Sequence, residues 1–284
     1  MLRKALALAV VASSAVFPYP TNSKGPNKTQ RRLEGLQKKL NTTNCPPPKM
    51  STKQSELFNE RELNGSFWCL DVKQAYDKRR QCITNKFFNL VLKQLKSPPK
   101  NVLIGFSGLC PEAIFALSVL PNAKFVCNEL NYPRLEHGSS LHGYLLKNSK
   151  SDIDINYDTQ SFSDLNAADI DPDNPTIDLL VLPSPKTNYK GVEDFDLHKK
   201  IKKLNANAIL FWTQLPHEHQ AFLRDFSTEK YRDEYDVYEL KDDKCGTPVN
   251  VDPDLGASFT EYNKGILLLK KDVSENVHQC DKNK

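Results

Sequence analysis

The stretch "NVLIGFSGLCPEAIFAL", residues 101–117, opens with a short apolar run, breaks, and restarts with helical character. The break carries Gly105, Ser107 and Gly108. A turn this sharp after a strand serves two kinds of chemistry. Small residues let the backbone approach a nucleotide-like ligand closely. A serine on such a turn can also be lifted clear of a sheet to act as a nucleophile.

Acidic residues at the ends of the next two predicted strands favour ligand binding. Glu129 ends the second predicted strand, and a carboxylate about 20 residues beyond the glycines can accept hydrogen bonds from both hydroxyls of a ribose. Asp158 follows the third predicted strand, with Phe162 nearby as a possible apolar wall. The alternatives are a solvated strand end for Glu129 and an ordinary turn residue for Asp158.

These residues are positioned by an alternation of strands and helices. Apolar spacing predicts a helix over 70–95. Strands follow in "NVLIGF", "AKFVCNEL", "DIDINY", "IDLLVLPSP" and "AILFWTQL", and helices at about 111–120, 133–146, 194–204 and 217–225. Such alternation implies right-handed crossovers and a mostly parallel sheet.

The last two predicted strands, "YDVYELK" and "KGILLLKK", have no convincing helix between them. A direct connection implies an antiparallel hairpin. We therefore predict an α/β fold with a seven-stranded, mostly parallel sheet, helices on both faces and a C-terminal antiparallel β-hairpin.

Over about residues 70–272 this order resembles the class I S-adenosylmethionine-dependent methyltransferase superfamily, which includes the aminopropyltransferases of the spermidine synthase group. The resemblance implies S-adenosylmethionine as cofactor, and group transfer from its sulfonium to a small-molecule or protein acceptor. It places Asp158 near the adenine amino group. The superfamily's loop has three spaced glycines, whereas this chain has two. The cofactor-binding residues that it implies are Gly105, Ser107, Gly108, Glu129 and Asp158.

The corner after the fourth predicted strand, "LPSPKTNY", departs from the superfamily. Amino-directed methyltransferases often carry Asn/Asp-Pro-Pro-aromatic there, and aminopropyltransferases place an acidic base at this point. At Leu182-Pro183-Ser184-Pro185 this chain keeps the prolines without an amide or carboxylate. Ser184 and Tyr189 are predicted only to position a substrate, and no catalytic residue is identified. The alternative function is a catalytically inactive binding or structural module.

A serine hydrolase is the other alternative, with Ser107 as nucleophile. The nucleophile elbow requires Gly-x-Ser-x-Gly, but position 109 is Leu. Only His278 follows the last predicted strand as a candidate base. No metal site is expected at His217 and His219, because residues two apart do not share a helix face.

Composition narrows the partners. The chain of 284 residues has 39 basic and 35 acidic residues. It has no basic patch with interleaved aromatic residues, so nucleic-acid binding is not predicted. Seven cysteines show no CxxC spacing, which argues against a zinc knuckle and leaves any disulfide pairing undetermined. Cys110 and Cys127 are interpreted as small buried apolar side chains.

The N-terminus has the pattern of a secretory signal peptide. Basic residues precede the apolar run 5–12, and small residues follow it. The run is too short to span a bilayer, so no transmembrane segment is predicted. Sequons at Asn27, Asn41 and Asn64 also favour the secretory pathway or the extracellular space. No acidic residue precedes Glu34, so a mitochondrial presequence is the alternative.

The predicted organisation has four parts. The polar, proline-punctuated second part is expected to be flexible, with a short basic helix at about 31–40. The parts are a signal peptide at 1–16, a flexible linker at 17–65, a methyltransferase-like domain at 66–275 and a tail at 276–284.

Overall fold

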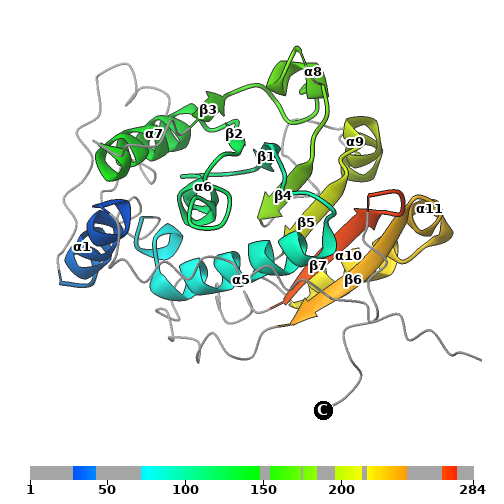
Figure 1. Ribbon diagram of the computed structural model, residues 1–284, viewed down its shortest axis with the longest axis horizontal. Helices are drawn as coiled ribbons and strands as arrows, with labels where there is room; N and C mark the ends of the chain where they lie inside the picture. The colour runs from blue at the N-terminus through cyan, green and yellow to red at the C-terminus, as the bar shows by residue number, and fades with distance from the viewer. Residues whose placement is uncertain are drawn as a thin grey trace, which may run out of the picture.

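The computed structural model describes residues 28–42, 72–147, 154–173, 175–183, 196–212, 216–241 and 264–273. A single twisted sheet runs through the molecule, with helices packed on both of its faces (Figure 1).

The sheet has seven strands in the order β3-β2-β1-β4-β5-β7-β6. Its first five strands pair in parallel, whereas β7 runs antiparallel to both β5 and β6. The predicted fold class and C-terminal hairpin are therefore confirmed. The strands are β1 (Asn101–Gly105), β2 (Lys124–Asn128), β3 (Asp154–Asp158), β4 (Leu179–Pro183), β5 (Ala208–Trp212), β6 (Tyr235–Lys241) and β7 (Lys264–Lys270).

The central strands are apolar throughout because both of their faces are covered. Every residue of β1, β4 and β5 is buried, which is the usual state of a parallel sheet between two helical layers. In contrast, the edge strand β3 has no fully buried residue.

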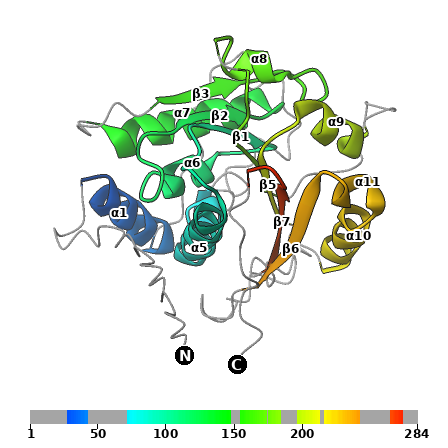
Figure 2. The ribbon, with the colours of Figure 1, turned by 45° about the vertical axis from the view of Figure 1, so that its right-hand side comes forward.

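Two layers of helices enclose the sheet (Figure 2). One face carries α5 (Lys78–Gln94), α6 (Pro111–Ala116) and α7 (Tyr132–Leu146). The other face carries α8 (Ala167–Ile170), α9 (Leu197–Leu204), α10 (Pro216–Phe226) and α11 (Glu229–Arg232).

Helix α5 begins later than its apolar pattern predicts. The expected helix over 70–95 is interrupted at Asp77, which has extended backbone and accepts hydrogen bonds from the backbone N–H groups of Arg79 and Arg80. This side chain caps α5 and separates it from a short helical turn at 72–75.

Residues 28–42 form α1 and are not part of a linker. Leu33 is buried in a cluster with Tyr76 and Leu145. The guanidinium of Arg32 donates to the carbonyl oxygens of Leu145, at 3.3 Å, and Lys147, so it satisfies carbonyls at the end of α7. The predicted helix exists and is longer than expected. The predicted signal peptide, the rest of the linker and the tail lie outside the described residues.

Within the ranges that the structure describes, no helix combines the length and apolar character needed to cross a membrane.

Candidate functional site

The turn between β1 and α6 has an unusual backbone. Phe106, Gly108 and Cys110 have φ values of +55°, +55° and +49°, in the left-handed region that glycine adopts most easily. For other residues this conformation costs roughly 1–2 kcal/mol. We call residues 106–110 the ligand loop. Its three left-handed residues alternate along the chain, at the turn where the resembled superfamily has three spaced glycines and this chain has two.

Gly105 has a different role from the one predicted. It is the buried last residue of β1, and its φ is not among the positive values. A Cβ at this position would lie 2.6 Å from Cε2 of Phe162. The absence of a side chain at Gly105 therefore makes room for Phe162 inside the core. Gly105 does not provide the open backbone that was predicted for contact with a ligand.

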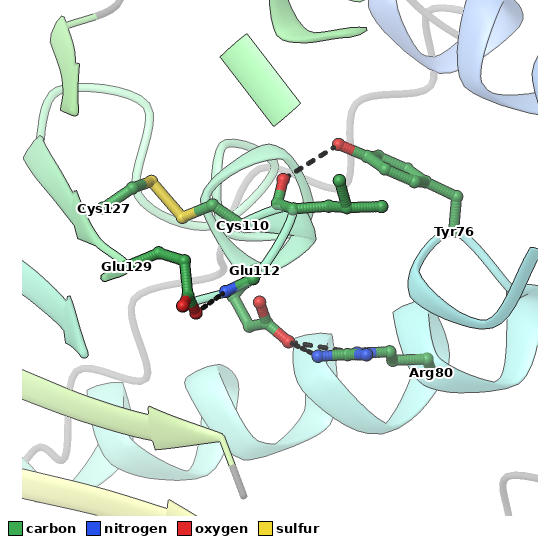
Figure 3. Close-up of polar contacts among 8 residues, drawn as sticks. Tyr76, Arg80, Cys110, Glu112, Cys127 and Glu129 are labelled. Atoms are coloured by element: carbon green, nitrogen blue, oxygen red, sulfur yellow. Dashed lines mark hydrogen bonds and ion pairs between the residues drawn. A yellow bond between two sulfur atoms is a disulfide. The ribbon is translucent and has the colours of Figure 1, made fainter. Parts of the chain in front are cut away.

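The ligand loop is attached to the end of β2 by three successive links. The N–H of Ser107 donates to the carbonyl oxygen of Asn128 at 3.0 Å. The N–H of Gly108 donates to Oε2 of Glu129 at 2.9 Å. A disulfide then joins Cys110 to Cys127 (Figure 3). The predicted proximity of the turn and Glu129 is thus present.

The disulfide corrects our interpretation of Cys110 and Cys127. Both are completely buried, as expected, but they are covalently joined and are not separate thiols. Among seven cysteines the pairing could not be deduced. One usable signal was that Cys110 closely follows the first predicted strand, whereas Cys127 lies inside the next one.

The Glu129 carboxylate keeps acceptor capacity. Oε1 accepts from the N–H of Asn131 at 2.9 Å, and Oε2 from Gly108. A carboxylate has about four acceptor positions, so each oxygen can accept one further hydrogen bond. The next residue, Leu130, is 49% exposed. A half-buried carboxylate therefore lies beside an exposed apolar side chain.

Asp158 ends β3, next to Glu129. The N–H of Glu129 donates to the Asp158 carbonyl oxygen at 3.0 Å, and Oδ1 of Asp158 accepts from the N–H of Gln160 at 2.9 Å. Asn128 donates from its side chain to the Gln160 carbonyl oxygen at 2.9 Å. The strand ends that carry the two acidic residues are consequently held together.

Phe162 does not form an exposed wall. Its side chain is 4% exposed, and its ring centroid lies 4.7 Å from that of Phe106. Phe162 belongs to the core cluster on the α8–α11 face, and Phe106 of the ligand loop packs against that cluster.

Ser107 lacks the surroundings of a nucleophile. Its side chain is 3% exposed, and its Oγ has no hydrogen-bond partner. A serine nucleophile needs an adjacent base, and none contacts Ser107 in the described part of the chain. The described residues therefore do not support the hydrolase alternative, and its candidate base, His278, lies outside them. A buried hydroxyl without a partner still requires an explanation, and a ligand atom would supply one.

Behind the ligand loop stands a buried polar framework that the sequence did not reveal. The Tyr76 hydroxyl donates to the carbonyl oxygen of Leu109 at 3.5 Å. Arg80 forms an ion pair with the fully buried Glu112 of α6, with one hydrogen bond from Nε at 3.0 Å. Figure 3 shows both contacts converging on the ligand loop and α6. Burial raises the pKa of Tyr76 well above its ordinary value.

Helix α7 supports the ligand loop from another side. A Cβ on Gly138 would lie 2.6 Å from the Leu109 carbonyl oxygen, so this glycine permits close packing. Further along, Nδ1 of His142 lies 2.7 Å from the hydroxyl of Tyr157. Burial lowers the pKa of His142 to about 3 and raises that of Tyr157 to about 12. Both side chains are therefore neutral at physiological pH.

The remaining residues considered in the sequence analysis add no described contact to the site. Ser184 and Tyr189 lie outside the described residues. Nε2 of His219 lies 3.2 Å from Oε1 of Glu239. Among the residues described, no three His, Cys, Asp or Glu side chains are grouped so that they could hold a metal ion.

The ligand loop and Glu129 occupy the place where open α/β sheets bind ligands. Strand β1 lies between β2 and β4, so the chain proceeds to one side of β1 and later returns to the other. Ligands bind outside the carboxyl ends of the strands at such a switch point.

No protein-family model matches the chain, and no curated protein matches its sequence. Among solved structures, it is similar to the plantazolicin methyltransferase BpumL in complex with SAH, with 8% identity and a TM-score of 0.46 over 86% of this chain and 100% of that one. It is also similar to a precorrin-6y C5,15-methyltransferase from Geobacter metallireducens GS-15, with 14% identity and a TM-score of 0.39 over 67% and 87% of the chains. Likeness at this level concerns the fold alone.

Proposed function

We propose that the chain binds S-adenosylmethionine where β1 and β2 end, and transfers a group from the adenosyl sulfonium to a small-molecule or protein acceptor. The observation that supports this most strongly is the direct hydrogen bond from the ligand loop, at Gly108, to the Glu129 carboxylate. This hydrogen bond holds a backbone that a ligand can approach closely next to a carboxylate that can accept hydrogen bonds from a ribose. Both lie at the topological switch point of the sheet.

The residues present fit such a ligand. Glu129 has acceptor positions for two hydroxyls, and the exposed Leu130 beside it offers an apolar contact for a base. No atom lies within 4 Å of where a Cβ on Gly108 would be, so the backbone is open there. The unpartnered Ser107 hydroxyl adds a donor and acceptor. Asp158 would stand next to the adenine.

The bound cofactor would supply an electrophilic carbon on its sulfonium. This chain's own residues would bind and orient it, and orientation is the main protein contribution to such a displacement. Glu129 would fix the ribose and the ligand loop would fix the neighbouring part of the ligand. Ser184 and Tyr189 are our candidates for positioning the acceptor.

A catalytically inactive binding module remains the second candidate, and one observation favours it. Asp178, the nearest carboxylate along β4, accepts from the N–H groups of Lys100 and Asn101 at 2.8 and 3.0 Å. These contacts are at the start of β1, which is the opposite end of the sheet from the ligand loop. Asp178 therefore cannot act as a base for the acceptor.

Titration calorimetry with S-adenosylmethionine and S-adenosylhomocysteine tests the proposal. We expect wild-type protein to bind both, and Glu129→Gln to weaken binding at least about tenfold, because it removes a charged acceptor of hydrogen bonds. Asp154→Asn, at the exposed start of β3, should bind like wild type. Failure of wild type to bind either compound at millimolar concentration would refute the proposal.

Transfer of label from methyl-labelled S-adenosylmethionine to mixtures of small molecules and proteins separates the two candidates. Transfer that is lost in Glu129→Gln supports the enzyme. Binding without transfer to any acceptor supports the inactive module.

For localisation we propose the secretory pathway, with the mitochondrion as the alternative. The support is the signal-like N-terminus together with the Cys110–Cys127 disulfide, because disulfides persist in oxidising compartments. Sequencing the mature N-terminus and testing for N-glycans would decide between them. An intact N-terminus without glycans would refute secretion.

A further inference from the structure

Cys110 has a conformation that its residue type disfavours. Its φ is +49° and its ψ +46°, and it is the N-cap of α6 without a side-chain capping bond. A residue with a Cβ occupies this region at a cost, and it persists there only when its surroundings enforce it. Something other than local preference must therefore hold Cys110.

Each of the three left-handed residues in the ligand loop has its own support. Gly108 needs none, because glycine adopts positive φ readily. Phe106 is held by the contact of its ring with Phe162. Cys110 is held by the disulfide to Cys127. Phe106 and Cys110 thus depend on tertiary contacts for the left-handed conformation that a glycine adopts by itself.

The partner of Cys110 is also in a fixed position. Cys127 lies in β2, paired with Ile104 of β1 on one side and Tyr157 of β3 on the other. The residue after it, Asn128, accepts from Ser107, and Glu129 accepts from Gly108. The disulfide therefore fastens the end of the ligand loop to the same strand end that receives its two hydrogen bonds.

We infer that the Cys110–Cys127 disulfide replaces a glycine: it holds position 110 in the left-handed conformation, and ligand affinity depends on it. The ligand part of this inference rests on the proposed function. Without the disulfide, a side chain at 110 favours other conformations, and only part of the molecules would present the loop in its binding form. Apparent affinity falls in proportion to that fraction.

Two double variants that differ only at position 110 test the inference. Cys110→Ala/Cys127→Ala and Cys110→Gly/Cys127→Ala both lose the disulfide, but only glycine adopts positive φ without cost. We expect the alanine form to bind S-adenosylhomocysteine about tenfold more weakly than wild type. We expect the glycine form to recover most of that loss. Cys82→Ala, outside the site, is the control for removing a cysteine.

Equal affinities in the two double variants would overturn the inference, whether both match wild type or both are weakened alike. A general loss of stability affects both in the same way, because both lack the same covalent link. Calorimetry is run at a temperature where circular dichroism shows that all variants are folded.

Hydrogen exchange at the Gly108 amide in ligand-free protein gives a readout that needs no ligand. We expect exchange to be slow in wild type, faster in the alanine form and again slower in the glycine form. If wild type fails to bind S-adenosylhomocysteine, the proposed function fails, and this order of exchange still decides the inference. Identical exchange in all forms would overturn it.

Should a double variant fail to fold, the comparison is made on wild type before and after reduction with a phosphine. This reaction converts the disulfide into two thiols, while the phosphine is oxidised to its oxide with oxygen from water. Faster exchange at Gly108 after reduction supports the inference. Unchanged exchange, with loss of the disulfide verified by thiol titration, overturns it.

Discussion

The two faces of the sheet are built from different interactions. On the α10–α11 face, aromatic rings pack on one another: Phe226 lies 5.4 Å from Phe211, 5.9 Å from Phe222 and 5.1 Å from Tyr231, measured between ring centroids. On the α5–α7 face, a disulfide and a buried ion pair accompany the apolar packing. Each face also has a hydrogen-bonded His–Tyr pair, His142–Tyr157 on this face and His198–Tyr231 on the other.

The difference follows from what each face adjoins. Apolar packing has no preferred direction and stabilises the fold as a whole. Hydrogen bonds, ion pairs and disulfides fix particular atoms, and those on the α5–α7 face lie next to the ligand loop. We call the α10–α11 side the aromatic face and the α5–α7 side the polar face. We expect the aromatic face to contribute mainly stability, and the polar face to contribute also the position of the candidate site.

The largest expected effect lies on the aromatic face. Phe226 is completely buried, and Phe226→Ala should lower the free energy of unfolding by about 3–5 kcal/mol through lost packing and the cavity that remains. Urea denaturation measures the loss, and Phe226→Leu is the milder control. Ligand affinity of the folded fraction should be unchanged. A change in affinity comparable to that of Glu129→Gln would contradict the division between the faces.

On the polar face, Arg80→Ala should cost about 3 kcal/mol, because it leaves the Glu112 carboxylate buried without its countercharge. The double variant Arg80→Met/Glu112→Gln should be clearly more stable than the single one, since no unpaired charge remains. Chemical denaturation of all three proteins gives the comparison. If the single and double variants are equally unstable, the ion pair acts only through packing.

Two glycines of α7 sharpen the contrast within one helix. Gly138→Ala places a Cβ against the backbone of Leu109 and should destabilise the protein by about 2 kcal/mol through overpacking. Gly143→Ala meets no atom within 4 Å and should stabilise it by about 0.5–1 kcal/mol through helix propensity. Thermal denaturation measures both. Only the first should also weaken ligand binding, because only Gly138 contacts the ligand loop.

The polar face should also respond to pH. The pKa of His142 is about 3 in the folded protein, against an ordinary value near 6.5. Below pH 6.5 the unfolded chain takes up a proton that the folded chain does not, so stability falls as the pH decreases towards 3. The slope is about 1.4 kcal/mol per pH unit. Urea denaturation between pH 7.5 and 4.5 should show this contribution in wild type and not in His142→Gln; identical slopes would contradict it.

Much of the fold could be predicted, because a sheet covered on both sides requires continuous apolar runs such as those of β4 and β5. The absence of a convincing helical pattern between the last two strands predicted their antiparallel pairing. The position of β7 between β5 and β6 was not predicted. Its continuous apolar run, residues 266–269, differs from the alternating pattern of β6 and is typical of an interior strand. The start of α5 was predicted too early. The apolar spacing extends before Asp77, but the carboxylate of Asp77 caps the helix and sets its first residue.

The placement of candidate residues could be predicted where residue type and position in the chain carry the pattern. Glu129 was found as an acid at a strand end, and Gly108 as a glycine in a turn. Phe106 and Cys110 were missed, because a left-handed backbone leaves no sign in the sequence when the residue is not glycine. The framework around Arg80 and Glu112 was missed because charged residues in helices usually face solvent.

The position of β7 has a consequence for how the molecule is made. Residues 264–270 follow every other strand in the chain, yet they separate β5 from β6 and pair with both. While the protein is being synthesised, β5 therefore exposes an unpaired edge after the first five strands have formed. Such an edge invites pairing with other chains. Chaperone protection should accordingly matter most in the interval before this late strand inserts.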